Sequence, residues 1–278
     1  MTAPDPGRRR LLALLGAAIG AAAVGAVAWW RDPGAISTDT PLLAGTSAPS
    51  STTSTSTSTS TLPPATTTTA APTTTTAAPT TTTAAGTVIT VIGRDGWGAR
   101  PSSDELEAHS ITRVTVHHTG VVLATNAEAP AAIRRHQDFH IDSRGWPDLA
   151  YHYMIDAAGN VYQGRHPDFA GDSRSYDTTG HLLVCCEGHF GRQVLPDAQR
   201  VSLEAMVAWA LAAYDVAADT IAGHGDYART SCPGDALRTL IADGTLQQTV
   251  TARLAAGGHT QMLVTGDEAA ALVSAIEG

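Results

Sequence analysis

The sequence predicts an α/β fold, with a central mixed β-sheet flanked by helices on both faces, preceded by an N-terminal apolar helix and a disordered linker. Three observations predict it. Residues 11–30 are uncharged and apolar, a tract of Ser, Thr, Ala and Pro follows, and strand-like and helix-like apolar patterns then alternate. We divide the chain into an N-terminal segment at 1–36, a linker at 37–87, a folded domain at 88–245 and a C-terminal extension at 246–278.

The charged residues exclude two classes of function. All 17 basic residues are arginine, because the sequence contains no lysine, so catalysis by a lysine is excluded. The formal net charge of -9 argues against a nucleic-acid partner, whose phosphates require a basic protein surface. Three cysteines are too few, and too clustered, to form the framework of a disulfide-stapled fold.

The apolar run at the N-terminus has the features of an export signal. Its length, from Leu11 to Trp30, is just enough to cross a bilayer, which needs roughly 20 apolar residues. The preceding arginines, from Arg8 to Arg10, favour an orientation that places the rest of the chain outside the cytoplasm. We therefore expect a membrane anchor. Cleavage at Ala26-Val27-Ala28 and export by a twin-arginine route are the alternatives.

The linker contains three tandem copies of a threonine-rich repeat, beginning at Thr66, Thr73 and Thr80. Such a tract cannot bury enough apolar surface to offset the entropy of ordering it. We expect a tether that spans about 40 Å as a coil.

The first elements of the folded domain are a strand and a helix. Residues 112–117 alternate between polar and apolar side chains, which predicts a strand that carries His117 at its C-terminal end. A helix is expected from near Asn126 to a point before Gly145. His140 has helical spacing within it and is interpreted as a hydrogen-bonded core histidine.

A hairpin is expected next. Residues 150–155 predict a strand, 156–160 a turn and 161–163 the returning strand. A period of two would place Tyr151 and Tyr153 on one face of the sheet, and His152 and Met154 on the other.

Residues 182–187 form a nearly continuous apolar run, which is typical of a central strand that is covered on both faces. Neighbouring side chains on a strand point to opposite faces. We therefore interpret Cys185 and Cys186 as one core and one partly exposed side chain, with a vicinal disulfide as the alternative.

The remaining elements are mostly helical. An amphipathic helix is expected from near Pro196 to Tyr214, then a short strand at 220–222, and a helix opened by Pro233 that reaches about Ile241. The C-terminal extension is expected to continue that helix over 249–255 and to end in an amphipathic helix over 267–276. We assign no catalytic or metal-binding role to the C-terminal extension.

The loop of residues 223–235 contains the candidate metal ligands. His224 and Cys232 lie eight positions apart in a segment too polar for a core, and His117 offers a third ligand from the end of its strand. Two nitrogens and one thiolate, with a fourth position left for water, are typical of catalytic zinc. The alternative is a surface loop that contains a buried cysteine.

Five motifs in order along the chain support the zinc interpretation. They are RDGWGAR at 94–100, VHHT at 116–119, GWPDLAYHY at 145–153, GNVYQGR at 159–165 and the loop at 223–235. Together they resemble the type 2 N-acetylmuramoyl-L-alanine amidase family, which includes the peptidoglycan recognition proteins. The resemblance extends from about Ile92 to Leu240.

The resemblance implies that His117, His224 and Cys232 bind Zn²⁺ and that Tyr151 and Thr230 are catalytic residues beside it. It implies a hydrolase that cleaves the amide bond between N-acetylmuramic acid and L-alanine of peptidoglycan. We expect a monomer in the bacterial cell envelope, with peptidoglycan as its partner. The alternative is a non-catalytic module that binds peptidoglycan.

Four neighbouring residues have separate interpretations. His118 points across the strand from His117, which favours a supporting or substrate-contacting role over ligation. His152 is interpreted as structural. Asp226 either orients the metal ligands or anchors their loop, and Arg165 either grips a peptide carboxylate or remains solvated.

Overall fold

The computed structural model describes residues 87–103, 105–257 and 259–278. The predicted N-terminal segment at 1–36 lies outside the described residues, as does the linker apart from Thr87, with which the first strand begins. Within the described part of the chain, no helix is both long enough and apolar enough to cross a membrane.

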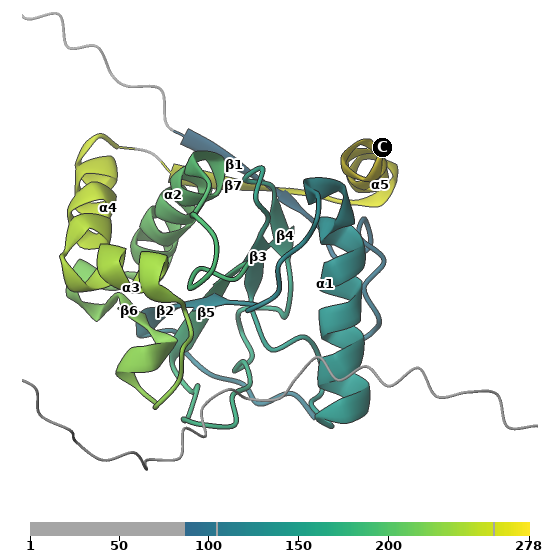
Figure 1. The fold of residues 1–278 in the computed structure, drawn as a ribbon, viewed down its shortest axis with the longest axis horizontal. Helices are drawn as coiled ribbons and strands as arrows, with labels where there is room; N and C mark the ends of the chain where they lie inside the picture. Colours follow the sequence, from purple (N-terminus) through teal and green to yellow (C-terminus); the bar gives the residue numbers. More distant parts are fainter. Residues whose placement is uncertain (1–86, 104, 258) are drawn as a thin grey trace, which may run out of the picture. The chain divides into compact units, whose positions relative to one another are not determined.

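A mixed sheet lies at the centre of the described region and has seven strands there, in the spatial order β6-β2-β5-β3-β4-β1-β7 (Figure 1). The strands are β1 (Thr87–Ile92), β2 (Arg113–His118), β3 (Tyr153–Ile155), β4 (Val161–Gln163), β5 (His181–Cys186), β6 (Ala222–Gly223) and β7 (His259–Val264). The β3–β4 hairpin is antiparallel, and every other neighbouring pair is parallel. The predicted mixed sheet is therefore confirmed.

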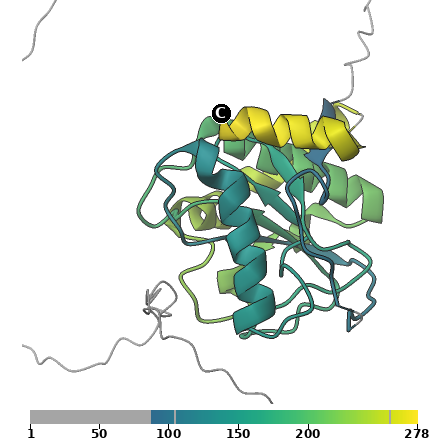
Figure 2. The same cartoon turned by 90° about the vertical axis from the view of Figure 1, so that its right-hand side faces the viewer.

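Helices cover both faces of this sheet, as predicted. Figure 1 shows α2 (Asp197–Tyr214), α3 (Asp235–Ala242) and α4 (Thr245–Ala255) on one side, and α1 (Ala129–Asp138) and α5 (Gly266–Glu277) on the other. Figure 2 shows α1 in front of the sheet, with the yellow α5 beside one end of it. Arg134 of α1 forms an ion pair with Glu277 of α5.

Four short helical turns connect these elements. They are η1 (Asn126–Glu128), the π-helical η2 (Phe139–Ser143), η3 (Ala218–Thr220) and η4 (His224–Asp226). The predicted helix between Asn126 and Gly145 therefore consists of η1, α1 and η2 in succession. Pro130 lies in the first turn of α1, where its missing N–H removes no helical hydrogen bond.

The alternation of side chains along the strands divides the core into two clusters. Val114 and Val116 of β2 pack in the cluster that contains the apolar residues of α2. The other cluster contains Ile133 of α1 and Val273 of α5. Because successive side chains point to opposite faces, His117 projects to the face covered by α1.

Both neighbouring cysteines of β5 are completely buried, and both are free thiols. Cys185 packs in the cluster on the α1 face and Cys186 in the cluster on the α2 face. The expectation that one of them would be partly exposed is wrong, because helices cover both faces of this central strand. The alternative of a vicinal disulfide is also wrong.

The predicted strand at 150–155 is shorter in the structure, where β3 begins at Tyr153. Tyr151 packs against the α1-side cluster together with Met154, whereas Tyr153 belongs to the α2-side cluster. The predicted pairing of Tyr151 with Tyr153 on one face is therefore wrong. A period of two does not apply to residues 150–152, since they precede the regular strand.

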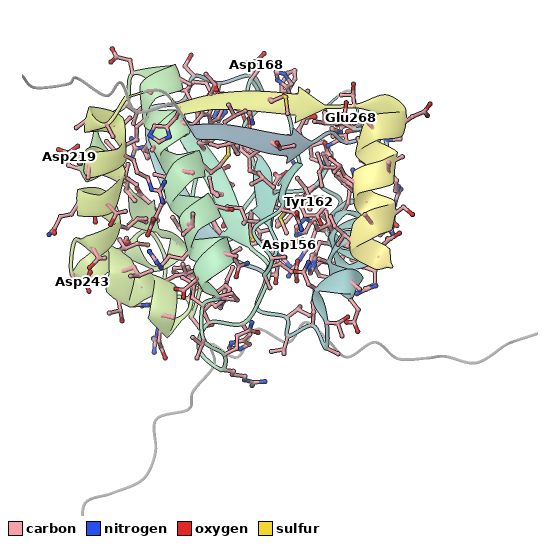
Figure 3. All side chains as sticks on the ribbon, turned by 90° about the horizontal axis from the view of Figure 1, so that it is seen from above. Asp156, Tyr162, Asp168, Asp219, Asp243 and Glu268 are labelled. Atoms are coloured by element: carbon pink, nitrogen blue, oxygen red, sulfur yellow. The ribbon has the colours of Figure 1, made fainter. Side chains whose placement is uncertain are left out.

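The turn between β3 and β4 is confirmed, and a buried carboxylate organises it. Asp156 is completely buried and accepts hydrogen bonds from the backbone N–H groups of Ala158 and Asn160. The hydroxyl of Tyr162 donates to the same carboxylate at 2.9 Å (Figure 3). These bonds fix the hairpin that directly follows Tyr151.

Near the C-terminus the structure differs from the prediction in three places. A separate helix, α4, follows α3 because Gly244 adopts a φ of 77° between them. The predicted strand at 220–222 is only the two residues of β6, preceded by η3. Strand β7, which was not predicted, pairs in parallel with β1 and lies beside it in Figure 3. The terminal helix α5 is confirmed.

Candidate metal centre

Three side chains from distant parts of the chain converge beside the end of β2. One ligand atom from each of His117, His224 and Cys232 lies within 4.8 Å of the other two. The Nδ1 atom of His117 lies 3.6 Å from the Sγ atom of Cys232. The group brings together the three residues that the sequence singled out as candidate metal ligands.

The strands bring the two histidines together. His117 is paired in register with Cys185, in the middle of the sheet. β6 runs parallel to β2, with Gly223 beside Val116, so the next residue, His224, emerges next to His117. The centroids of the two imidazole rings are 4.8 Å apart.

Asp226 anchors the loop that carries His224. Its Oδ2 atom accepts a hydrogen bond from the backbone N–H of Gly223 at 2.7 Å. That bond caps the short helix η4. Of the two roles considered for Asp226, the structure favours the anchoring one.

Cys232 is held by the loop around it. Its backbone N–H donates to the hydroxyl of Thr230 at 3.2 Å. The backbone N–H of His118 points at the Cys232 sulfur, 3.4 Å away. Gly234 has a φ of 88°, and a Cβ atom there would approach the Nδ1 atom of His118 to 2.9 Å. Only glycine allows this close seating of the loop.

Burial decides the protonation states of two candidate ligands, His117 and Cys232. Burial, reinforced by the neighbouring His224, lowers the pKa of His117 well below its ordinary value, so its imidazole is neutral. Burial also raises the pKa of the Cys232 thiol to about 12, so this cysteine is protonated at neutral pH. A cation that binds there must displace the thiol proton.

The geometry of the group suits zinc. Zinc–nitrogen bonds of about 2.0–2.1 Å and a zinc–sulfur bond of about 2.3 Å, at a tetrahedral angle, place N and S about 3.6 Å apart. The distance between His117 Nδ1 and Cys232 Sγ has this value. Two imidazoles and one thiolate leave the fourth tetrahedral position for water or substrate.

Tyr151 lies beside the three candidate ligands. Its ring centroid is 5.2 Å from that of His117 and 5.7 Å from that of His140. Burial, with Cys185 as a further cause, raises the pKa of the Tyr151 phenol well above its ordinary value. The phenol therefore remains a hydrogen-bond donor at neutral pH.

Arg165 supports the irregular segment that carries Tyr151. Its side chain is buried and donates to the carbonyl oxygens of Asp148, Leu149 and Ala170, and it forms an ion pair with Asp172. Its backbone N–H also donates to the carbonyl of Tyr151. Both predicted roles for Arg165 are therefore wrong. The hairpin folds its side chain inward, away from solvent.

The neighbouring histidines have structural contacts. His118 is buried on the face opposite to His117, where its Nδ1 atom accepts a hydrogen bond from the backbone of Phe190 at 3.3 Å. His140 accepts one from the backbone of Ala150 at 3.1 Å, and His152 from that of Leu183 at 2.8 Å. The core role of His140 and the structural role of His152 are confirmed. His118 supports the metal loop rather than joining the three ligands.

Sequence reasoning missed two residues that contact the candidate ligands. The hydroxyl of Tyr176 lies 2.9 Å from the Nε2 atom of His117, and that of Ser175 lies 2.8 Å from the Nε2 atom of His224. Both belong to the polar segment between β4 and β5. Its only distinguishing signal in the sequence is a tyrosine among Ser, Asp and Thr residues.

The sequence has identifiable relatives. Residues 107–235 match the family model described as N-acetylmuramoyl-L-alanine amidase. Peptidoglycan-recognition protein SC2 of Drosophila melanogaster is 27% identical over 147 residues, which cover 52% of this chain and 80% of that protein. An N-acetylmuramoyl-L-alanine amidase of Sus scrofa is 28% identical over 152 residues, but the match covers only 25% of its length.

Solved structures share the fold. Wild-type Drosophila PGRP-LB superposes with a TM-score of 0.50 at 25% identity, covering 56% of this chain and 94% of that one. Peptidoglycan recognition protein LE in complex with tracheal cytotoxin superposes with a TM-score of 0.51 at 26% identity, covering 55% and 92%. Residues 107–235 of this chain therefore form a domain of the N-acetylmuramoyl-L-alanine amidase family, with the peptidoglycan-recognition proteins among its relatives.

Proposed function

We propose that this domain is a zinc-dependent N-acetylmuramoyl-L-alanine amidase that hydrolyses the amide bond between N-acetylmuramic acid and L-alanine of peptidoglycan. One observation carries the proposal. His117, His224 and Cys232 present three zinc-type donor atoms within 4.8 Å of one another, with the partly buried Tyr151 beside them. A site that only bound peptidoglycan would not require a buried cysteine in this group.

In the proposed mechanism, the two histidines and Cys232 hold zinc. The bound metal supplies a Lewis acid for the scissile carbonyl and for the attacking water. Tyr151 donates a hydrogen bond to the oxygen on which negative charge develops in the transition state. Its raised pKa keeps the donor proton in place at neutral pH.

Thr230 has a smaller part in this proposal. Its hydroxyl accepts a hydrogen bond from the backbone N–H of Cys232 at 3.2 Å and keeps its own proton to donate. We propose that it fixes the Cys232 backbone and donates a hydrogen bond to the substrate. A threonine hydroxyl is too weak an acid to protonate a leaving amine.

A second candidate function is peptidoglycan recognition without hydrolysis. It is favoured by the relatives named as recognition proteins and by the structure of one of them in complex with tracheal cytotoxin, a monomeric diaminopimelic acid-type peptidoglycan. The same site would serve both functions. What separates them is the role of the three metal-type donors.

We propose that the domain acts outside the cytoplasm, in a bacterial cell envelope. The support comes from the sequence, where arginines precede the apolar run at 11–30 and a long threonine-rich tract follows it. The predicted membrane anchor would tether the domain within reach of the wall.

Dye-labelled insoluble peptidoglycan distinguishes hydrolysis from recognition. We expect the full-length protein to release soluble dye, and a chelator to abolish the release until zinc is restored. Co-sedimentation of the protein with peptidoglycan, without release of dye at any zinc concentration, would support the recognition function instead.

A further inference from the structure

One short segment contacts both candidate metal histidines at their Nε2 atoms. Tyr176 lies 2.9 Å from the Nε2 atom of His117, and its neighbour Ser175 lies 2.8 Å from the Nε2 atom of His224. The contacts involve the same ring atom in both histidines. They come from consecutive residues of the segment between β4 and β5.

The direction of these hydrogen bonds determines which nitrogen of each histidine is available to a metal. When a hydroxyl accepts a hydrogen bond from Nε2–H, the imidazole is the tautomer with an unprotonated Nδ1. In His117 that Nδ1 atom is the one 3.6 Å from the Cys232 sulfur. In His117, Nε2 therefore contacts the Tyr176 hydroxyl, while Nδ1 faces the Cys232 sulfur.

The Tyr176 ring is packed firmly enough to hold this position. It stacks on the ring of Tyr227 at a centroid distance of 5.3 Å and an interplanar angle of 19°. Its centroid lies 5.0 Å from that of His224 and 5.2 Å from that of His181. Aromatic contacts on several sides restrict the ring, so the hydroxyl has few alternative places.

The part of this segment that carries the two residues, 171–178, is anchored at both ends. Near its start, Gly171 packs so closely that a Cβ atom there would lie 2.4 Å from the carbonyl oxygen of Ala150. The next residue, Asp172, is paired with the buried Arg165. Near its end, the hydroxyl of Thr178 donates to the carbonyl of Gly171 at 2.7 Å. Ser175 and Tyr176 are thus fixed relative to the sheet that carries His117.

We propose that Ser175 and Tyr176 are positioning residues of the metal centre, which accept hydrogen bonds from Nε2–H of His224 and His117 and so present both Nδ1 atoms to the metal. This inference rests on the zinc role proposed above for the two histidines. Neither hydroxyl touches the metal or the substrate in this proposal. Their effect is to hold the tautomer and the ring orientation of each ligand.

The test uses the full-length protein and measures zinc affinity by competition with a chromogenic chelator. We expect Tyr176→Phe and Ser175→Ala each to weaken zinc binding by about 10-fold or more, the range for lost partners of metal-bound histidines. Tyr227→Phe removes a hydroxyl from the neighbouring stacked ring, and Ser143→Ala removes an exposed one at the end of η2. Both control variants should bind zinc as the parent does.

A second readout identifies the coordinating atoms directly. Long-range ¹H–¹⁵N spectra of the zinc-loaded protein report which imidazole nitrogen binds metal and which carries a proton. We expect Nδ1 coordination and a protonated Nε2 in both His117 and His224. Urea titration measures the free energy of unfolding of each variant without metal. This free energy should equal that of the metal-free parent if the two residues act through the metal.

The outcomes separate this inference from the proposed function. Zinc bound through Nε2, or unchanged zinc affinity in both Tyr176→Phe and Ser175→Ala, would overturn the positioning role while leaving the zinc enzyme intact. A parent protein that binds no zinc would overturn the proposed function itself, and with it this inference.

Discussion

The Nδ1 atom of His117 lies 3.6 Å from the Sγ atom of Cys232, although 115 positions separate the two residues in the chain. The end of β2 supplies the histidine, and a loop seated on His118 and Phe190 supplies the thiol. This contact is the part of the fold on which the proposed chemistry depends.

The first prediction concerns zinc itself. We expect the protein to bind one zinc ion, and expect His117→Ala or Cys232→Ser to weaken binding by more than about 100-fold, since loss of a ligand should exceed the loss of an outer partner. Chelator competition measures the affinity. His166→Ala, which removes an exposed histidine, is the control. Equal zinc affinity in Cys232→Ser and the parent would exclude the thiolate as a ligand.

The second prediction concerns Tyr151. Removing one donor to a developing oxyanion typically lowers kcat by about 10²–10³-fold, and we expect a loss of this size in Tyr151→Phe. The phenol contacts no metal in the proposed mechanism, so the zinc affinity should not change. Steady-state kinetics on a soluble muropeptide, together with chelator competition, measure both quantities. A variant with unaltered kcat would remove Tyr151 from the mechanism.

The third prediction concerns the stability provided by Arg165. The ion pair of Arg165 is only partly buried, because the Asp172 side chain is 24% exposed. We expect Arg165→Met to lower the free energy of unfolding by about 3 kcal/mol or more, since each buried polar group left without its partner costs about 1–3 kcal/mol. Three carbonyl oxygens would lose their donor as well. Urea denaturation of metal-free protein measures the change. Arg174→Met, an exposed arginine in the following segment, should cost less than about 0.5 kcal/mol.

The fourth prediction concerns pH and His152. This buried imidazole accepts a hydrogen bond from the backbone of Leu183, and its Nε2 atom lies 2.9 Å from the carbonyl oxygen of Phe169. The first contact requires an unprotonated Nδ1 and therefore the neutral ring, in which Nε2–H donates to the Phe169 carbonyl. Burial lowers its pKa to about 3.

The sign of the effect follows from comparing the two states. The unfolded chain takes up the His152 proton near pH 6.5, whereas the folded protein does so only near pH 3. The contribution of His152 to stability is therefore complete above pH 6.5. It falls by about 1.4 kcal/mol per pH unit as the pH drops toward 3.

Urea denaturation at several pH values, on metal-free protein, tests this dependence. We expect His152→Gln to be less stable than the parent at pH 7 and to show a shallower loss of stability below pH 6. His166→Gln, which alters an exposed histidine, should retain the slope of the parent. Identical slopes in His152→Gln and the parent would contradict the account.

Much of the fold was predictable because its main elements carry strong periodic patterns. The alternation that ends at His117, the apolar run of β5 and the spacing along α2 each match the observed element to within about two residues. Strand β7 was missed because its sequence, HTQMLV, has no clear apolar alternation. Its partner, β1, lies more than 160 positions earlier in the chain.

The candidate ligands were predictable, whereas the residues that support them were not. His117, His224 and Cys232 belong to metal-type residue classes, and the five ordered motifs around them support a zinc site where their spacing alone does not. Arg165 looks like a solvated arginine in the sequence and becomes a buried donor only because the hairpin folds it inward. The contacts of Ser175 and Tyr176 with the histidines could not be predicted, because they depend on an aromatic cluster that the fold assembles from four separate segments.

The most direct test of the central claim is the chemical identity of what the full-length protein releases from purified peptidoglycan in the presence of zinc. Mass spectrometry should find stem peptides that begin with a free L-alanine amine, with none released after chelation or by Cys232→Ser. Retained binding to peptidoglycan without release of any peptide would contradict the amidase and leave a recognition module. Peptides cleaved at another bond would contradict the proposed bond preference.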